Sequence, residues 1–200
     1  MSPRPDVSEK RKHQIIEAAS TVFARLGFNQ ARMVDIAEEA RLSKGTIYWY
    51  FKGKDEIISA ILENMLKHEV SQMDNALNND LPAKENLQQF TECVVEDILR
   101  LKPLIPILFE FWALLTRRKS VQQTINKFYQ AYMEVITPII QHGINRGEFR
   151  SVSAENVAIA IGSIFEGTIL LWSCAPEIVD LEEHIHSSIN ILIEGLEVKI

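Results

Sequence analysis

Apolar residues recur with the period of an α-helix along almost the whole chain. In the first such stretch, Ile15, Ala19, Val22 and Leu26 fall on one helical face, and Gly27 follows in the position of a C-terminal cap. No segment alternates apolar and polar residues as a half-buried strand would. The chain is therefore predicted to be all-α, with about nine helices and no sheet.

The predicted helices divide into a small head and a larger body. We expect helices at about 8–26, 34–40, 44–50, 56–75, 83–101, 103–118, 120–145, 153–174 and 181–198. Asp55 is a good N-cap for the helix 56–75, and the stretch 78–82 has the composition of a linker. The predicted head spans residues 8–55, the predicted body spans residues 56–200, and the helix 56–75 connects the two.

Charge is distributed unevenly over these two parts. The net charge is −6, but residues 1–55 carry ten Lys and Arg against seven Asp and Glu, whereas residues 56–200 carry eleven against twenty. A basic start on an acidic body favours, weakly, a polyanion as a partner of the head.

Several classes of protein are disfavoured by composition. Cys93 and Cys174 lie far apart and are not paired with histidines, so neither a disulfide framework nor a zinc site is predicted. The sequence offers no apolar signal segment near residue 1, and the longest apolar run, 157–172, contains Glu166 and is interpreted as a buried helix. We expect a cytoplasmic protein with no membrane partner, no metal and no cofactor.

Residues 34–53 have the features of a helix-turn-helix. Ala37 and Ala40 are small where two helices would cross, and Ile36, Leu42 and Ile47 are apolar on both sides of the turn. This pattern predicts two short helices packed across a tight turn, with these five side chains in the core.

The second of these short helices is the predicted DNA-reading element. Ser43 can cap it, and its first residues, Lys44, Gly45 and Thr46, are small or cationic and would face the major groove. The free N–H groups at its start favour a phosphate. Three consecutive aromatic residues cannot all point inward, so at least one should be exposed to a phosphate or a thymine methyl group: Tyr48, Trp49 and Tyr50.

The run from Ser43 to Phe51, followed by Lys54 and Asp55, resembles the signature of the TetR family nearly letter for letter. Gly27-Phe28 before Asp35-Ile36-Ala37 fits the same pattern, and residues 146–149 (Arg-Gly-Glu-Phe) resemble the loop after the family's long body helix. The resemblance implies an all-helical homodimer that binds a double-stranded DNA operator through its head. It also implies a small-molecule effector in the body, and a transcriptional regulator, most simply a repressor, rather than an enzyme.

The resemblance also assigns roles to residues of the head. Carried over position by position, the candidates for reading bases are Lys44, Thr46 and Trp49, and the candidates for phosphate contacts are Tyr48, Tyr50 and Lys54. Lys10, Arg11 and Lys12 either reach the DNA backbone or minor groove or form only a solvated helix start.

Two positions depart from the family pattern. Members usually carry Thr or Ser just before the first short helix, where this chain has Arg32, which becomes the candidate for the phosphate contact. The turn position usually held by Gly is Arg41, where a positive φ would cost about 1 kcal/mol. These departures keep open an alternative, a helical protein-interaction module with a degenerate helix-turn-helix; an enzyme is disfavoured more strongly because no catalytic constellation has plausible spacing.

The last two long helices are predicted to form the dimer interface. Their apolar stripes comprise Val157, Ile161, Ile164, Thr168 and Leu171 in the first and Leu181, Ile185, Ile189, Leu192 and Leu196 in the second. Ile159, Ile169 and Leu170 lie elsewhere on the first helix, so more than one of its faces needs burial.

An effector pocket is predicted among the helices 83–101, 103–118, 120–145 and 153–174. They supply aromatic walls, namely Phe90, Phe109, Trp112, Phe128, Tyr132 and Phe165. Glu110 and Glu166 lie deep within apolar runs, where a carboxylate is costly unless it is paired, bonded or protonated. Two interpretations stay open. Each carboxylate has a structural role, with a partner such as Arg117, Arg118 or a backbone group or with a place on an exposed face, or it is a pocket acid for a flat, lipophilic, cationic effector.

Overall fold

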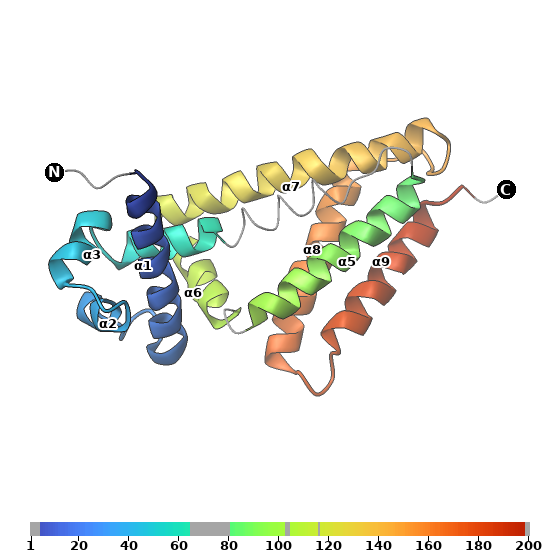
Figure 1. Ribbon diagram of the computed structural model, residues 1–200. Coiled ribbons are helices and arrows are strands. Elements are labelled where there is room, and N and C mark those ends of the chain that lie inside the picture. Colours follow the sequence, from blue (N-terminus) through green and yellow to red (C-terminus); the bar gives the residue numbers. More distant parts are fainter. Residues whose placement is uncertain (1–4, 65–80, 103–104, 116, 199–200) are drawn as a thin grey trace. The chain divides into compact units, whose positions relative to one another are not determined.

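The computed structural model describes residues 5–64, 81–102, 105–115 and 117–198, and it confirms the all-α prediction (Figure 1). The named helices are α1 (Pro5–Leu26), α2 (Met33–Glu39), α3 (Lys44–Tyr50), α5 (Ala83–Leu101), α6 (Ile105–Leu115), α7 (Lys119–Asn145), α8 (Ala154–Cys174) and α9 (Leu181–Leu196). A further helix is described over residues 54–64, which brings the described helices to nine. Within the described ranges there is no strand, only an isolated bridge between Phe149 and Glu197.

Two expectations fall partly outside these ranges. The connecting helix was expected over 56–75, and its part beyond residue 64 lies outside the described residues. So do the first three positions of the expected linker at 78–82.

The chain forms two compact units that do not coincide with a division at residue 55. Unit 1 comprises Met1–Lys67 and Leu101–Lys127, and unit 2 comprises His68–Arg100 and Phe128–Ile200. The head therefore shares its unit with α6 and the first turns of α7, and the division falls inside α7.

The core of unit 1 is built from the residues that the helical periodicity singled out. Ile15, Ala19 and Val22 of α1 are fully buried, and Ile36, Ala37, Ala40 and Ile47 pack in the same cluster, as predicted. Ile107 of α6 and Val121 of α7 are buried there too. These two side chains lie far from the head in sequence but pack in its core, which explains why α6 belongs to the unit that carries α2 and α3.

The core of unit 2 lies among α5, α8, α9 and the second part of α7. Phe90, Ile136, Ile161 and Ile185 are fully buried in it, one from each helix. Helix α7 continues through Pro138.

Helix α8 is long and apolar enough to cross a membrane by length and composition alone, the one such helix among the described residues. Its buried side chains, however, include Val157, Ile161 and Phe165 in the core of unit 2. An apolar helix with one face in a protein core has the same composition, so this is weak evidence for a membrane span.

Candidate nucleic-acid interface

The start of α3 has the cap that the sequence predicted. Ser43 is extended (φ −69°, ψ 149°), and its Oγ accepts a hydrogen bond from Thr46 N at 3.0 Å. The two hydroxyl groups of Ser43 and Thr46 lie 2.8 Å apart. Ile47 and Phe51 are buried, which fixes the inner face of this short helix against the head core.

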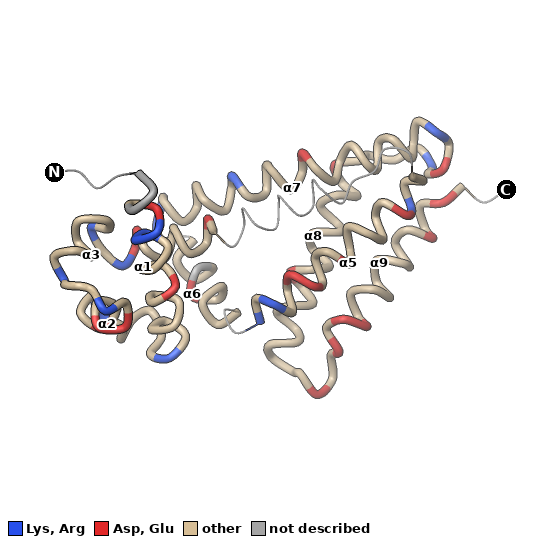
Figure 2. The backbone as a smooth tube through the Cα atoms, viewed as in Figure 1, with Lys and Arg blue, Asp and Glu red and all other residues tan. Residues whose placement is uncertain are grey.

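The outer face of α3 carries cationic and aromatic side chains. Trp49 is 61% exposed and Tyr48 is 46% exposed, while Tyr50 packs partly against the head core. Lys44 Nζ lies 5.8 Å from the centre of the Tyr48 ring, so the two residues share a face. Trp49 meets Tyr50 edge-on at 4.6 Å between ring centroids. Figure 2 shows Lys and Arg positions along α1, on either side of α2 and at the start of α3.

Gly45 leaves the start of α3 without a side chain, although the fold does not need this. A Cβ at this position would meet only Ser43 Oγ, at 3.7 Å, an ordinary contact. The missing side chain therefore opens the outside of the helix to the close approach of another molecule.

The turn between α2 and α3 contains the predicted strain. Arg41 has φ +53°, the one positive φ of a non-glycine residue among the described residues. Arg41 N donates to Glu38 O and Leu42 N donates to Ala37 O, the bonds of a helix end that glycine usually completes. Another carbonyl of this end, Ala40 O, accepts a hydrogen bond from Gln14 Nε2 of α1 at 2.7 Å.

Arg32 has an ion-pair partner at the start of α2. Its backbone N–H donates to Asp35 Oδ2 at 2.7 Å, and its guanidinium lies 3.1 Å from Asp35 Oδ1. The guanidinium holds the pKa of Asp35 below its usual value. Asp35 thus supplies one half of a capping box, the bond from the third helical residue to the N–H of the N-cap residue, which the sequence did not predict.

Lys54 is engaged in the loop between α1 and α2. Its Nζ donates to Ala31 O at 2.6 Å, to Asn29 O at 3.2 Å and to Phe28 O, and it lies 4.7 Å from the centre of the Phe28 ring. The ammonium group predicted to contact phosphate therefore orders the loop before α2.

Glu110 is bonded to the same loop. Phe28 N donates to both carboxylate oxygens of Glu110, at 2.7 and 3.0 Å. Of the two interpretations that the sequence left open, the structure gives Glu110 the backbone partner, inside unit 1.

The basic residues at the start of α1 are exposed. Lys10, Arg11 and Lys12 all lie at its surface, and Arg11 donates to Gln14 Oε1 at 2.7 Å. Gln14 thereby joins this basic segment to the turn before α3, because its amide nitrogen bonds Ala40 O.

The aromatic residues predicted to line a pocket are split between the two units. Phe109 and Trp112 meet edge-on within α6 of unit 1, at 5.3 Å between centroids. In unit 2, Phe90 lies 6.1 Å from both Tyr132 and Phe165, and all three are buried. Phe128, also in unit 2, is half-buried.

Two polar groups accompany the cluster in unit 2. Tyr132 Oη donates to Ala158 O at 2.7 Å, and burial raises the pKa of this phenol far above its usual value. Glu166, the next residue after Phe165, is half-buried, and burial raises the pKa of its carboxyl. The described residues contain no group of three or more His, Cys, Asp or Glu side chains placed to hold a metal ion.

Most of the residues predicted at the dimer interface are buried within the protomer. Val157, Ile161, Thr168, Leu181, Ile185, Ile189 and Leu196 are all less than a tenth exposed, Ile164 and Leu192 are partly buried, and only Leu171 is exposed. The prediction that these residues form the dimer interface is therefore wrong for most of them, because the most regular apolar stripe of each helix faces the protomer's own core. The apolar side chains left exposed on the two helices are Ile159, Leu170, Leu171 and Ile191.

Comparison with known proteins places this geometry in a family. A family described as "Bacterial regulatory proteins, tetR family" matches residues 15–61, and "Tetracyclin repressor-like, C-terminal domain" matches residues 86–174. The chain is 31% identical over 157 residues to an uncharacterized HTH-type transcriptional regulator, YfiR, of Bacillus subtilis, covering 76% of this chain and 75% of that one.

Two solved structures have the same fold. One is a TetR transcription regulator from Haloarcula marismortui, with a TM-score of 0.85 at 18% identity over 95% of this chain and 100% of that one. The other is a transcriptional regulator from Saccharomonospora viridis in complex with choline, with a TM-score of 0.83 at 22% identity over 96% of this chain and 100% of that one.

Proposed function

Because the chain belongs to the TetR family of bacterial transcriptional regulators, we propose that it represses genes by binding a palindromic operator as a homodimer, and that a small lipophilic effector releases it. The observation that carries the DNA half of this proposal is the outer face of α3. A capped helix start presents Lys44, Gly45 and Thr46, and two exposed aromatic rings follow.

Each of these groups has a task on DNA. Lys44 and Thr46 suit base edges in the major groove, with Trp49 beside them, while Tyr48 and Tyr50 suit phosphates. The bare backbone at Gly45 permits close approach to a phosphate.

The test begins with selection of binding duplexes from a pool of random sequence, followed by footprinting. We expect two protected half-sites related by two-fold symmetry, about one helical turn or somewhat more apart. Thr46→Ala should weaken the selected site by roughly 1–3 kcal/mol, the value of a good base contact. Gly45→Ala should weaken it without harming folding, since the new methyl group meets only Ser43 Oγ. Lack of symmetric protection by the wild type would reject the operator model.

The proposed dimer surface consists of one stripe on each of the last two helices. On α8 it runs through Ile159, Ser163, Gly167, Leu170 and Cys174, and on α9 through His184, Ser188, Ile191 and Gly195. A Cβ at Gly167 or Gly195 would meet nothing within 4 Å, so both positions would let a partner helix come close. Ile191 is 67% exposed and Ile159 is 56% exposed, which favours a partner that covers them.

Light scattering tests this surface directly. The wild type should have a mass near twice 22.9 kDa. Ile191→Glu should give a monomer, because a carboxylate would be buried against its two-fold mate. Ile178→Glu is the matched control, since Ile178 is exposed in the loop before α9 and lies on neither stripe. A dimeric Ile191→Glu variant would reject the proposed surface.

The proposed effector site lies in unit 2, beside Phe90, Tyr132 and Phe165, with Phe128 nearby in sequence and Glu166 as its acid. Aromatic rings and one carboxylate suit a lipophilic cation through ring contacts and charge. A regulator of the same fold binds choline, a quaternary ammonium compound, which supports this class of ligand.

Titration with choline and with rhodamine 6G, followed by tryptophan fluorescence, tests the proposal, with a neutral aromatic compound for comparison. Glu166→Gln should weaken both cations and leave the neutral compound unchanged. Glu155→Gln, an exposed acid at the start of the same helix, is the control. Equal cation affinities in the wild type and Glu166→Gln would reject Glu166 as the group that binds the cation. If none of the three compounds quenches the fluorescence of the wild type, a lipophilic cation is rejected as the effector.

A further inference from the structure

The loop between α1 and α2, residues 27–32, is held by two opposite charges from outside it. Glu110 of α6 accepts the N–H of Phe28, and Lys54 donates to the C=O of the same residue. Both contacts lie within unit 1. The peptide groups on either side of Phe28 are thus fixed by side chains that come from α6 and from the helix 54–64.

The Phe28 N–H has no partner within α1. Helix α1 ends at Leu26, and Gly27 follows with φ +74° and donates to Phe23 O at 2.8 Å. This single bond is the αL type of helix end, which leaves the next N–H without a helical partner. That N–H bonds a carboxylate, although a negative charge at a helix C-terminus opposes the helix dipole. A contact placed against this preference indicates a role other than capping alone.

The position of Glu110 on α6 indicates that this role is to fix the loop between α1 and α2. Glu110 is the only charged residue in the sequence of α6, and it lies between aromatic neighbours, Phe109 and Phe111. Gly27 leaves little room beside it, since a Cβ at Gly27 would lie 3.3 Å from Glu110 Oε1. A shift of α6 would therefore also displace the loop that leads into α2.

We propose that Glu110 is a positioning residue for DNA binding: its carboxylate holds the α1–α2 loop in the geometry that the helix-turn-helix needs. This inference rests on the proposed function and adds to it a group on α6 that contacts no DNA. When the bond is lost, the loop samples other arrangements. The apparent affinity for DNA then falls in proportion to the fraction of molecules whose loop keeps the binding geometry.

Three variants test this. Glu110→Ala removes the acceptor, Glu110→Gln keeps one acceptor oxygen at the same place, and Ile58→Val trims a fully buried side chain of the same core without touching the loop. The measurements are affinity for the duplex selected by the wild type, and hydrogen exchange of the Phe28 amide. Both are made at a temperature where every variant is folded.

We expect Glu110→Ala to weaken the duplex about tenfold and to speed exchange at Phe28 by a similar factor, with Glu110→Gln between it and the wild type. Ile58→Val should leave both quantities near their wild-type values, because a loss of global stability does not free this loop. If the wild type binds its duplex, an unchanged DNA affinity of Glu110→Ala or an unchanged exchange rate at Phe28 would overturn the inference. A wild type that selects no duplex would instead overturn the proposed function, and this inference with it.

Discussion

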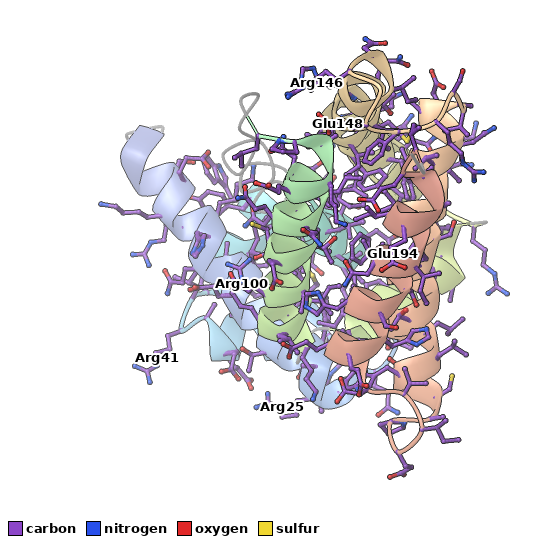
Figure 3. All side chains as sticks on the ribbon, turned by 90° about the vertical axis from the view of Figure 1, so that its right-hand side faces the viewer. Arg25, Arg41, Arg100, Arg146, Glu148 and Glu194 are labelled. Carbon is purple, nitrogen blue, oxygen red and sulfur yellow. The ribbon has the colours of Figure 1, made fainter. Side chains whose placement is uncertain are left out.

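Replacing Arg41 with glycine should stabilise the protein, because Arg41 occupies a backbone conformation that suits glycine. Its φ is +53°, which costs an L-residue about 1–2 kcal/mol. Glycine loses about 0.5–1 kcal/mol more conformational entropy on folding, so the net gain lies in the range of about 0–1.5 kcal/mol, with its middle at ~0.75 kcal/mol. The side chain is exposed and points outward, so little packing is lost (Figure 3). The gain should appear as a higher urea midpoint at constant slope and equal protein concentration.

Arg41→Ala is the matched control for this prediction. It removes the same charge and keeps the strain, so its urea midpoint should stay close to that of the wild type. The difference between the glycine and alanine variants therefore isolates the backbone conformation from electrostatics. A glycine variant no more stable than the alanine variant would refute the argument from φ.

Three further changes have expected outcomes in unit 2. Gly143→Ala should destabilise the protein by about 1–3 kcal/mol in urea unfolding, because the new Cβ would lie 2.5 Å from the Phe149 ring. Tyr132→Phe should cost about 0.5–1.5 kcal/mol, the net value of the hydrogen bond to Ala158 O; a change in the opposite direction would contradict the geometry. The raised pKa of Glu166 gives a contribution to stability that is complete below about pH 4.3 and is lost as pH rises through the folded-state pKa. Glu166→Gln should therefore gain stability over the wild type between acid and neutral pH, and parallel pH profiles of the two proteins would contradict this.

Much of the fold follows from local pattern. Ser43 and Asp180 are the N-caps of α3 and α9, and their side chains accept backbone hydrogen bonds from the first turn of each helix. Residues of this type are visible in the local sequence. The five small and apolar residues around the turn pack as predicted, because a helix-turn-helix leaves few alternatives for them. The membership of α6 in unit 1 could not be predicted, since it depends on Ile107 packing against residues more than 40 positions away.

The candidate sites show the same limit. Helical periodicity finds apolar stripes but does not say which stripe faces the protomer's own core, so Ile161 and Ile185 were placed at a dimer surface although both are fully buried. A carboxylate in an apolar run indicates that a partner is needed, yet only the fold could show that the partner of Glu110 is the amide of Phe28.

A polar side chain bonds a backbone group at each departure from the family pattern in the head. Asp35 accepts the N–H of Arg32, the N-cap residue of α2, and Gln14 donates to Ala40 O beside the strained Arg41. Helix ends leave backbone groups without helical partners, and buried ones must be satisfied from somewhere. Because these two bonds come from different elements, each acts on its own end of α2. It follows that Arg41→Gly relieves strain without disturbing the cap at Asp35, and that the two positions should contribute to stability independently.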